Sequence, residues 1–246
     1  MGQSLFIRLK HMAQENEIKI VLKKISVEKF IKTLKTKGFK FSKEIHQTDI
    51  YFDTKDWFLY ENIAALRLRL VNDNDNSFSF KKVFYTPLNK NKFYVEEIET
   101  KFPFTRISDF KNIFERLQIE YNSRKFRSGQ ELVEFMRTNN YYDDQIMSKV
   151  RQVFVMNDNE MVIDNVDKVG TIIELECKND DPLVIIKTIL NDDEWERSVE
   201  GTSYMWLKNV KGLTSHISNF KKFEKSPRWN VWRNEEEYYK EISNPN

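Results

Sequence analysis

The sequence predicts an α+β fold in which antiparallel strands close into a barrel and helices pack against its outside. Several segments alternate charged and apolar residues, as at 64–71, where Arg67 and Arg69 alternate with leucines. A strand turns successive side chains to opposite faces, so each such segment has one charged and one apolar face. Other segments have apolar residues at helical spacing on one face, and such helices need an apolar surface to cover. The backs of the strands supply that surface, which leaves the charged faces pointing into the barrel.

The alternation recurs from one end of the chain to the other. The first predicted strand ends at Leu22 and places Glu15, Glu17 and Lys19 on one face. The segment QTDIYFD at 47–53 alternates in the same way, with its polar residues on one side. The remaining predicted strands are 64–71, 78–82, 94–99, 149–151, 161–164 and 171–177, with turns at 72–76 and around Pro87.

The helices are predicted from caps and from periodic apolar residues. Ser26 is a suitable N-cap for a helix that ends before Gly38, where a left-handed residue is expected. Ser128 and Glu131 have capping-box spacing and predict a short helix to about residue 136. The other helices are predicted at 108–117, 182–190, 203–212 and 234–242.

The composition describes a folded protein with balanced charge. Lys and Arg number 40 and Asp and Glu 38 in 246 residues, a net charge of +2 that argues against a general polyanion-binding surface. Cys177 is the single cysteine, which excludes an internal disulfide, and a packed strand residue is the simplest interpretation of it. Without an apolar run near 18 residues or a signal peptide, a cytoplasmic location and no membrane contact are expected.

No fixed repeat or low-complexity linker divides the chain, so one domain is predicted over 1–246. Its core spans about 15–212, with an insertion at about 119–146 and a helical tail at 213–246.

The inward faces of the predicted barrel carry acids and bases in equal number. The acids are Glu15, Glu17, Glu97, Glu99, Glu174 and Glu176. The bases are Lys19, Arg67, Arg69, Lys81, Lys149 and Arg151; alternation from Ser79 favours Lys81 over Lys82 as the inward residue. So many charges in one cavity are costly unless they pair or meet a charged ligand. A polyphosphate with divalent metal suits both sets, because carboxylates bind Mg²⁺ or Mn²⁺ and cations bind phosphate. Solvated surface stripes and plain cross-strand ion pairs remain alternatives for each pair.

These residues, in this order, resemble the CYTH superfamily, the triphosphate tunnel metalloenzymes. The signature E-x-E-x-K corresponds to Glu15, Glu17 and Lys19, the A-L-R-x-R strand to 65–69, and the late acidic strand to 173–176. The segment 47–53, the K-x-R strand at 149–151 and the pair Ser203-Tyr204 also match. The resemblance covers about residues 15–210 and implies an eight-stranded antiparallel barrel that is open as a tunnel.

The resemblance also implies roles for individual residues. The implied metal ligands for Mg²⁺ or Mn²⁺ are Glu15, Glu17, Glu99, Asp164, Glu174 and Glu176. The implied phosphate-binding residues are Lys19, Arg67, Arg69, Lys81, Lys149 and Arg151. The implied catalytic set is Glu15, Glu17, Lys19, Glu97, Glu99 and Glu174.

The resemblance leaves three functions open. A metal-dependent triphosphate hydrolase is preferred, acting on an inorganic, organic or nucleoside triphosphate. The 5′-triphosphate end of an RNA is the one nucleic-acid substrate retained. A class IV-type adenylyl cyclase is second, because the segment 163–176 resembles that branch, whereas its His-Phe element before the first glutamate is not evident. A non-catalytic polyphosphate sensor is third, with the insertion and tail as its output. The sequence leaves a homodimer open.

Overall fold

The computed structural model describes residues 12–14, 16–62, 64–85, 93–103, 107–198 and 201–212. Glu15 and the predicted tail helix at 234–242 lie outside these residues. Within them, no helix is long and apolar enough to cross a membrane.

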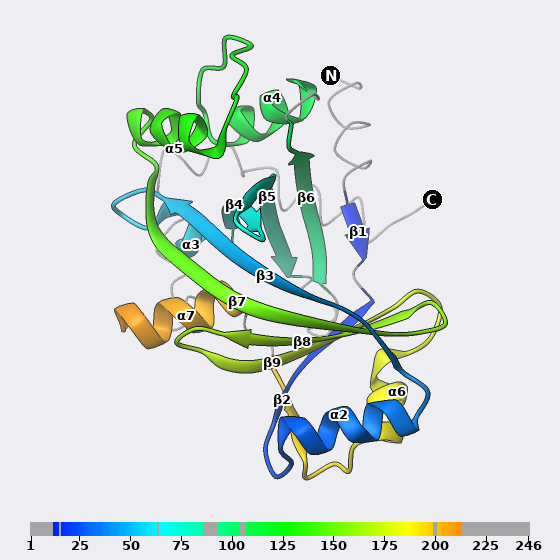
Figure 1. Cartoon of the computed structure of the whole chain (residues 1–246). Helices are drawn as coiled ribbons and strands as arrows, with labels where there is room; N and C mark the ends of the chain where they lie inside the picture. The colour runs from blue at the N-terminus through cyan, green and yellow to red at the C-terminus, as the bar shows by residue number, and fades with distance from the viewer. Residues whose placement is uncertain are drawn as a thin grey trace, which may run out of the picture.

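The described strands form one antiparallel sheet of ten strands (Figure 1), in the order β1-β6-β5-β4-β3-β7-β8-β9-β2-β10. Their bounds are β1 Met12–Gln14, β2 Glu17–Leu22, β3 Lys40–Asp53, β4 Ala64–Val71, β5 Asn74–Tyr85, β6 Phe93–Lys101, β7 Tyr142–Met156, β8 Asn159–Val166, β9 Gly170–Cys177 and β10 Trp195–Arg197. Eight of the strands are long; β1 and β10 have three residues each and were not predicted. The predicted α+β class is therefore confirmed, with two short strands added.

The sheet closes through the N-terminal segment of the chain. β1 pairs with β6, whereas β2 pairs with β9 near the other end of the strand order. Gln14 and Glu17 are three residues apart, so the two halves of this segment are separated by at most about 11 Å. No hydrogen-bonded ladder joins β1 to β10 among the described residues. The two ends of the sheet are therefore connected by the chain between β1 and β2, and the hydrogen-bonded ladder around the barrel is not strictly closed.

Helices cover the outside of this sheet in two groups (Figure 1). They are α2 (Val27–Thr36), α3 (Phe58–Glu61), α4 (Ile107–Arg116), α5 (Gly129–Thr138), α6 (Pro182–Ile189) and α7 (Thr202–Lys211). The first core cluster joins the outer faces of β4 and β5 to α4 and α5, through side chains such as Phe78, Phe110 and Phe114. The second joins β2, β8 and β9 to α2 and α6, and it contains Cys177, which is buried as predicted. These apolar layers fix the charged faces inward.

Helix α7 packs across one end of the barrel. Its Trp206 and Leu207 contact a third apolar cluster that includes Met147, Val166 and Ile172. Met147 alternates with Lys149 and Arg151 on the inward face of β7. The inward face is therefore apolar at this end, and α7 covers it.

The short helix predicted after Ser128 is present as α5. The Ser128 hydroxyl accepts a hydrogen bond from the Glu131 amide, as a capping residue does. The Asp75 carboxylate accepts another from the Gly129 amide at 2.6 Å, which ties α5 to the start of β5. Strand β7 begins at Tyr142, earlier than the predicted 149–151, because pairing with β3 extends it through a polar segment without alternation.

Candidate functional site

The inward faces of β2 to β9 enclose a charged tunnel. The cavity has a volume of about 410 Å³, and all eight long strands contribute side chains to it, together with the first residues of α7. Of the residues predicted from the sequence, those that line it are Glu17, Lys19, Arg67, Arg69, Lys81, Glu97, Glu99, Lys149, Arg151, Glu174 and Glu176. Glu15 lies outside the described residues, and Asp164 is buried on the inward face of β8, where Lys149 and Arg151 contact it.

Three tunnel-lining glutamates form a row across neighbouring strands. Glu17 on β2 lies directly opposite Glu176 on β9, and Glu176 lies opposite Glu160 on β8. Like charges at directly opposed positions destabilise a sheet unless a cation lies between them. Glu160 was missed because the β8 pattern was read from Met161 onward; one more step of the alternation would have included it.

A chain of ion pairs links the next positions along the tunnel. Lys19 Nζ lies 2.9 Å from Glu174 Oε1, and Glu174 Oε2 lies 3.2 Å from Arg151 Nη2. Burial alone would raise the pKa of Glu174, but Lys19 and Arg151 outweigh it and lower that pKa to about 2. Glu174 is therefore ionised throughout the physiological range and holds both cations in the tunnel.

Asp164 supports two of the bases from below. Its Oδ2 accepts hydrogen bonds from Lys149 Nζ and Arg151 Nη2, both at 2.7 Å, and its Oδ1 accepts one from Arg151 Nε at 2.8 Å. Burial lowers the pKa of Lys149, which Asp164 partly counteracts. With both oxygens engaged, Asp164 orients the two bases in this geometry, and its role as a metal ligand stays a prediction.

Asp49 on β3 has the same relation to the arginines of β4. It is 1% exposed and accepts two hydrogen bonds from Arg69, at 2.7 Å each. Arg67 Nη1 lies 3.9 Å away, while the buried Nε of Arg67 has no hydrogen-bond partner among the described residues. Burial would raise the pKa of Asp49, but Arg69 and Arg67 lower it. Arg67 thus lines the tunnel, while its Nε is buried and has no acceptor among the described residues.

The remaining charges lie on β5 and β6. Lys81 is directly opposite Glu97, with 4.0 Å between Nζ and Oε2, and both line the tunnel together with Glu99. The neighbouring Lys82 points away and donates a hydrogen bond to the Asn62 carbonyl. The alternation from Ser79 therefore identified the inward lysine correctly.

The donor chemistry of the acid row fits a divalent cation. Glu17, Glu176 and Glu160 present carboxylate oxygens, which are the ligands that Mg²⁺ and Mn²⁺ prefer. No three acidic, histidine or cysteine side chains in the described part of the chain converge closely enough to make a complete metal site. Glu15, two residues before Glu17, is the further ligand predicted from the sequence, and it lies outside the described residues.

Comparisons with known proteins agree with this architecture. A family model described as the CYTH domain matches residues 13–189. A protein of Methanocaldococcus jannaschii, described as a candidate adenylate cyclase, is 31% identical over 165 residues, which cover 65% of this chain and 75% of that protein.

Two solved structures share the fold. A Pyrococcus horikoshii protein has a TM-score of 0.52 at 16% identity, over 78% of this chain and 99% of that one. A conserved hypothetical protein of Pyrococcus furiosus has a TM-score of 0.50 at 19% identity, over 77% of this chain and 99% of that one.

Proposed function

Because the chain belongs to the CYTH family, we propose that it is a divalent-metal-dependent triphosphate hydrolase whose substrate binds in the charged tunnel. Members of this family bind triphosphates and are adenylyl cyclases or triphosphatases, in general dependent on a divalent metal. The proposal for this chain rests on how its own tunnel charges are arranged.

Acids and bases occupy different parts of the tunnel wall, and this observation carries the proposal. Most bases project from β5 and β4 and, beyond β3, from β7, while most acids project from β6 and from the group β8, β9 and β2. Lys19 on β2 is the exception among the bases, and ion pairs such as Lys81–Glu97 join the two sets where they meet. A separated arrangement suits a ligand with two parts, an anion on the basic wall and a cation on the acidic wall.

The basic wall would hold the triphosphate. Arg67 lines the tunnel with its Nη1 3.9 Å from Asp49, and Arg69 is fixed by two hydrogen bonds to the Asp49 carboxylate. Lys149 and Arg151 are fixed by Asp164 in the same way. Cations held by buried acids need little reorganisation when phosphate oxygens arrive, which favours stabilisation of the charge that develops during phosphoryl transfer.

The acidic wall would hold the metal and the attacking water. Glu15, Glu17 and Glu176 are the proposed metal ligands, with Glu160 added from the structure. When bound, Mg²⁺ or Mn²⁺ would neutralise phosphate charge and activate water. Glu97 and Glu99 project into the tunnel from β6, which pairs with β1, and their carboxylates can accept a proton from a water molecule.

Adenylyl cyclase activity is the second candidate, favoured by the described activity of the M. jannaschii relative. The same tunnel would then present the ribose hydroxyl to the α-phosphorus. A triphosphate sensor without turnover is the third candidate.

Product analysis separates these functions. The full chain is incubated with ATP, inorganic triphosphate or thiamine triphosphate, with Mg²⁺ or Mn²⁺, and the products are resolved by chromatography. Phosphate release supports the hydrolase, and cyclic AMP with pyrophosphate would replace it with the cyclase. Metal-dependent binding of a triphosphate without any product would support the non-catalytic sensor.

A matched pair of arginine variants tests the tunnel itself. Arg67→Ala removes a tunnel donor, whereas Arg127→Ala removes an exposed arginine before α5. We expect kcat/KM for the preferred triphosphate to fall at least about tenfold in Arg67→Ala and to stay unchanged in Arg127→Ala. Equal kinetics in the two variants would exclude the tunnel as the site.

A further inference from the structure

A second, smaller cavity lies next to the tunnel, beside the start of α7. Its volume is about 180 Å³, and it shares Tyr51, Ala65, Ser203 and Tyr204 with the tunnel wall. On β4, Ala65 follows Arg69 and Arg67 on the same face, and each two-residue step along a strand is about 7 Å. The side cavity therefore begins about 7 Å beyond Arg67. Ala65 lines both cavities, and its side chain is only a methyl group, so it takes up little space where the two cavities adjoin.

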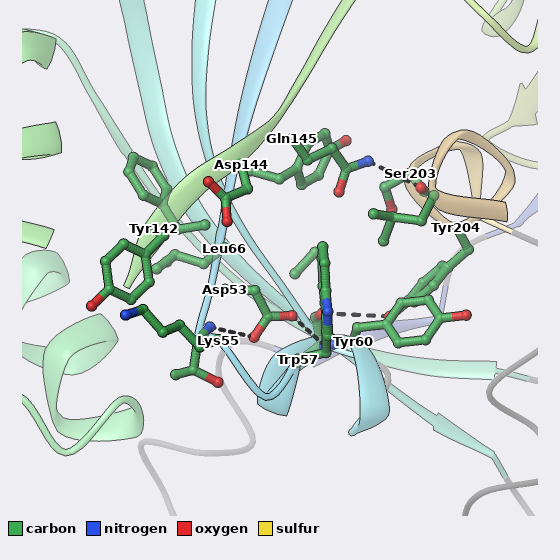
Figure 2. A pocket seen from close by; sticks show the side chains of 16 residues that line it. Asp53, Lys55, Trp57, Tyr60, Leu66, Tyr142, Asp144, Gln145, Ser203 and Tyr204 are labelled. Carbon is green, nitrogen blue, oxygen red and sulfur yellow. Dashed lines mark hydrogen bonds between the residues drawn. The ribbon is translucent and has the colours of Figure 1, made fainter. Parts of the chain in front are cut away.

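Aromatic rings form much of its wall. Figure 2 shows Trp57, Tyr60 and Tyr204 on one side of the cavity and Tyr142 on the other. The Tyr60 and Tyr204 ring centroids are 5.2 Å apart, and those of Trp57 and Tyr60 are 6.4 Å apart. Flat aromatic ligands stack well on such surfaces.

The segment that carries these rings is held in a defined conformation. Trp57 has φ 56°, a left-handed conformation that is costly for a large side chain. The Asp53 carboxylate compensates by accepting hydrogen bonds from the amides of Leu59 and Tyr60, at 2.8 Å each. Strained residues that the surrounding structure fixes in this way cluster at ligand sites.

Polar groups of both kinds line the cavity, with the Asp144 carboxylate as acceptor and the Lys55 ammonium as donor. Gln145 is buried and donates one of its two amide hydrogens to the Ser203 carbonyl at 3.0 Å. The Asp144 carboxylate makes no hydrogen bond to any other described residue, and it points into the cavity in Figure 2. The Asp53 carboxylate already accepts hydrogen bonds from backbone amides. Lys55 lies 5.2 Å from the ring centroid of Tyr142, at the outer side of the cavity.

We propose that this side cavity binds the organic part of the triphosphate and that this part is an aromatic heterocycle with an exocyclic amino group. The heterocycle would lie against Trp57 and the tyrosines, and its amino group would donate to Asp144. This inference rests on the proposed function, because the phosphates must lie on the basic wall for the heterocycle to reach the cavity.

Binding measured without turnover tests the proposal. ATP, ITP and tripolyphosphate are titrated calorimetrically into the full chain in EDTA, which prevents metal-dependent reaction. ITP differs from ATP at the purine ring, where a carbonyl replaces the amino group and would place an acceptor against the carboxylate. We expect ATP to bind at least about tenfold more tightly than ITP, the usual effect of one hydrogen bond to a charged group. CTP and UTP provide a second amino–carbonyl pair with the same expected order.

Two variants assign the effect to residues. Asp144→Asn offers a donor as well as an acceptor, so the preference for ATP over ITP should fall to about onefold. Asp158→Asn, at the exposed turn between β7 and β8, is the matched control and should retain the preference. Trp57→Leu should weaken ATP and ITP together and leave tripolyphosphate unchanged. Asp144 is exposed, so its variant tests the proposal even if Trp57→Leu does not fold.

The outcomes separate this proposal from the proposed function. Equal affinity for all three ligands in the unmodified protein, or an unchanged ATP preference in Asp144→Asn, would overturn the proposal that the side cavity binds the heterocycle. Neither result would affect the proposed triphosphate site in the tunnel. Absence of binding by tripolyphosphate and both nucleotides would overturn the phosphate site and the side cavity together.

Discussion

Two ion pairs of nearly the same geometry should differ widely in their contribution to stability, because one is buried. Arg69 contacts Asp49 through two hydrogen bonds of 2.7 Å, and Arg137 contacts Asp143 through two of 2.6 and 2.8 Å. In the first pair Asp49 is 1% and Arg69 16% exposed, whereas in the second Asp143 is 15% and Arg137 52% exposed. The substitutions Asp49→Asn and Asp143→Asn therefore make the same chemical change in two environments.

The expected magnitudes follow from burial. Removing one partner of a buried ion pair costs about 3–5 kcal/mol, because the remaining charge stays desolvated. Because Arg69 still lines the tunnel, we expect a cost at the lower end of this range, about 3 kcal/mol. Arg67 and Lys149 lie near Asp49 and lose part of their compensation as well. For the exposed pair, loss of the carboxylate charge should cost about 0.2–1 kcal/mol.

Urea unfolding of the three proteins, followed by circular dichroism at pH 7, measures both differences. We expect a midpoint well below that of the unmodified protein for Asp49→Asn and a small shift for Asp143→Asn. Tripolyphosphate should restore part of the lost stability in Asp49→Asn, because its charge compensates the arginines. If Asp49→Asn lost less stability than Asp143→Asn, the tunnel would be too hydrated for burial to determine how much each ion pair contributes to stability. That result would refute the reasoning.

Three further predictions concern the fold around the tunnel. Gly129→Ala would place a Cβ against the Asp75 carboxylate and 2.9 Å from Leu68, so thermal unfolding should show a loss of stability of about 1–3 kcal/mol; a loss below that of exposed Gln130→Ala would contradict it. The folded-state pKa of Glu174 is about 2, below its ordinary 4.5, so its contribution to stability is complete above about pH 4.5 and is lost as the pH falls toward 2. Acid titration of Glu174→Gln should therefore show a shallower decline than the unmodified protein, and parallel curves would refute this. Phe114→Ala removes a fully buried ring between the sheet and α5 and should cost about 3–5 kcal/mol in urea unfolding; a loss under 1 kcal/mol would show that this core repacks.

Local alternation was enough to identify most of the tunnel wall. Arg67 and Arg69 face inward because the leucines between them must face the helices, and this follows from the two-residue period of a strand. The same reasoning selected Lys81 over Lys82. The caps of α2, α5 and α6 were also predictable, because they depend on side chains within three residues of the helix start.

Strand pairing was decided by the tertiary structure. β3 pairs with β7, about 100 residues away, and β2 pairs with β9, more than 150 residues later in the chain. These registers set Gln47 beside Lys149 and Glu17 beside Glu176, and neither neighbour can be read from its own segment. The short strands β1 and β10 exist only because a longer strand offers an edge to them.

The sequence by itself determined which side chains share a face, because the backbone geometry that sets a face extends over only a few residues. Only the tertiary structure decided which faces meet, because packing and register join residues far apart in the chain. That is why the charges of the tunnel were predictable, whereas the cover provided by α7 and the aromatic cavity beside it were not.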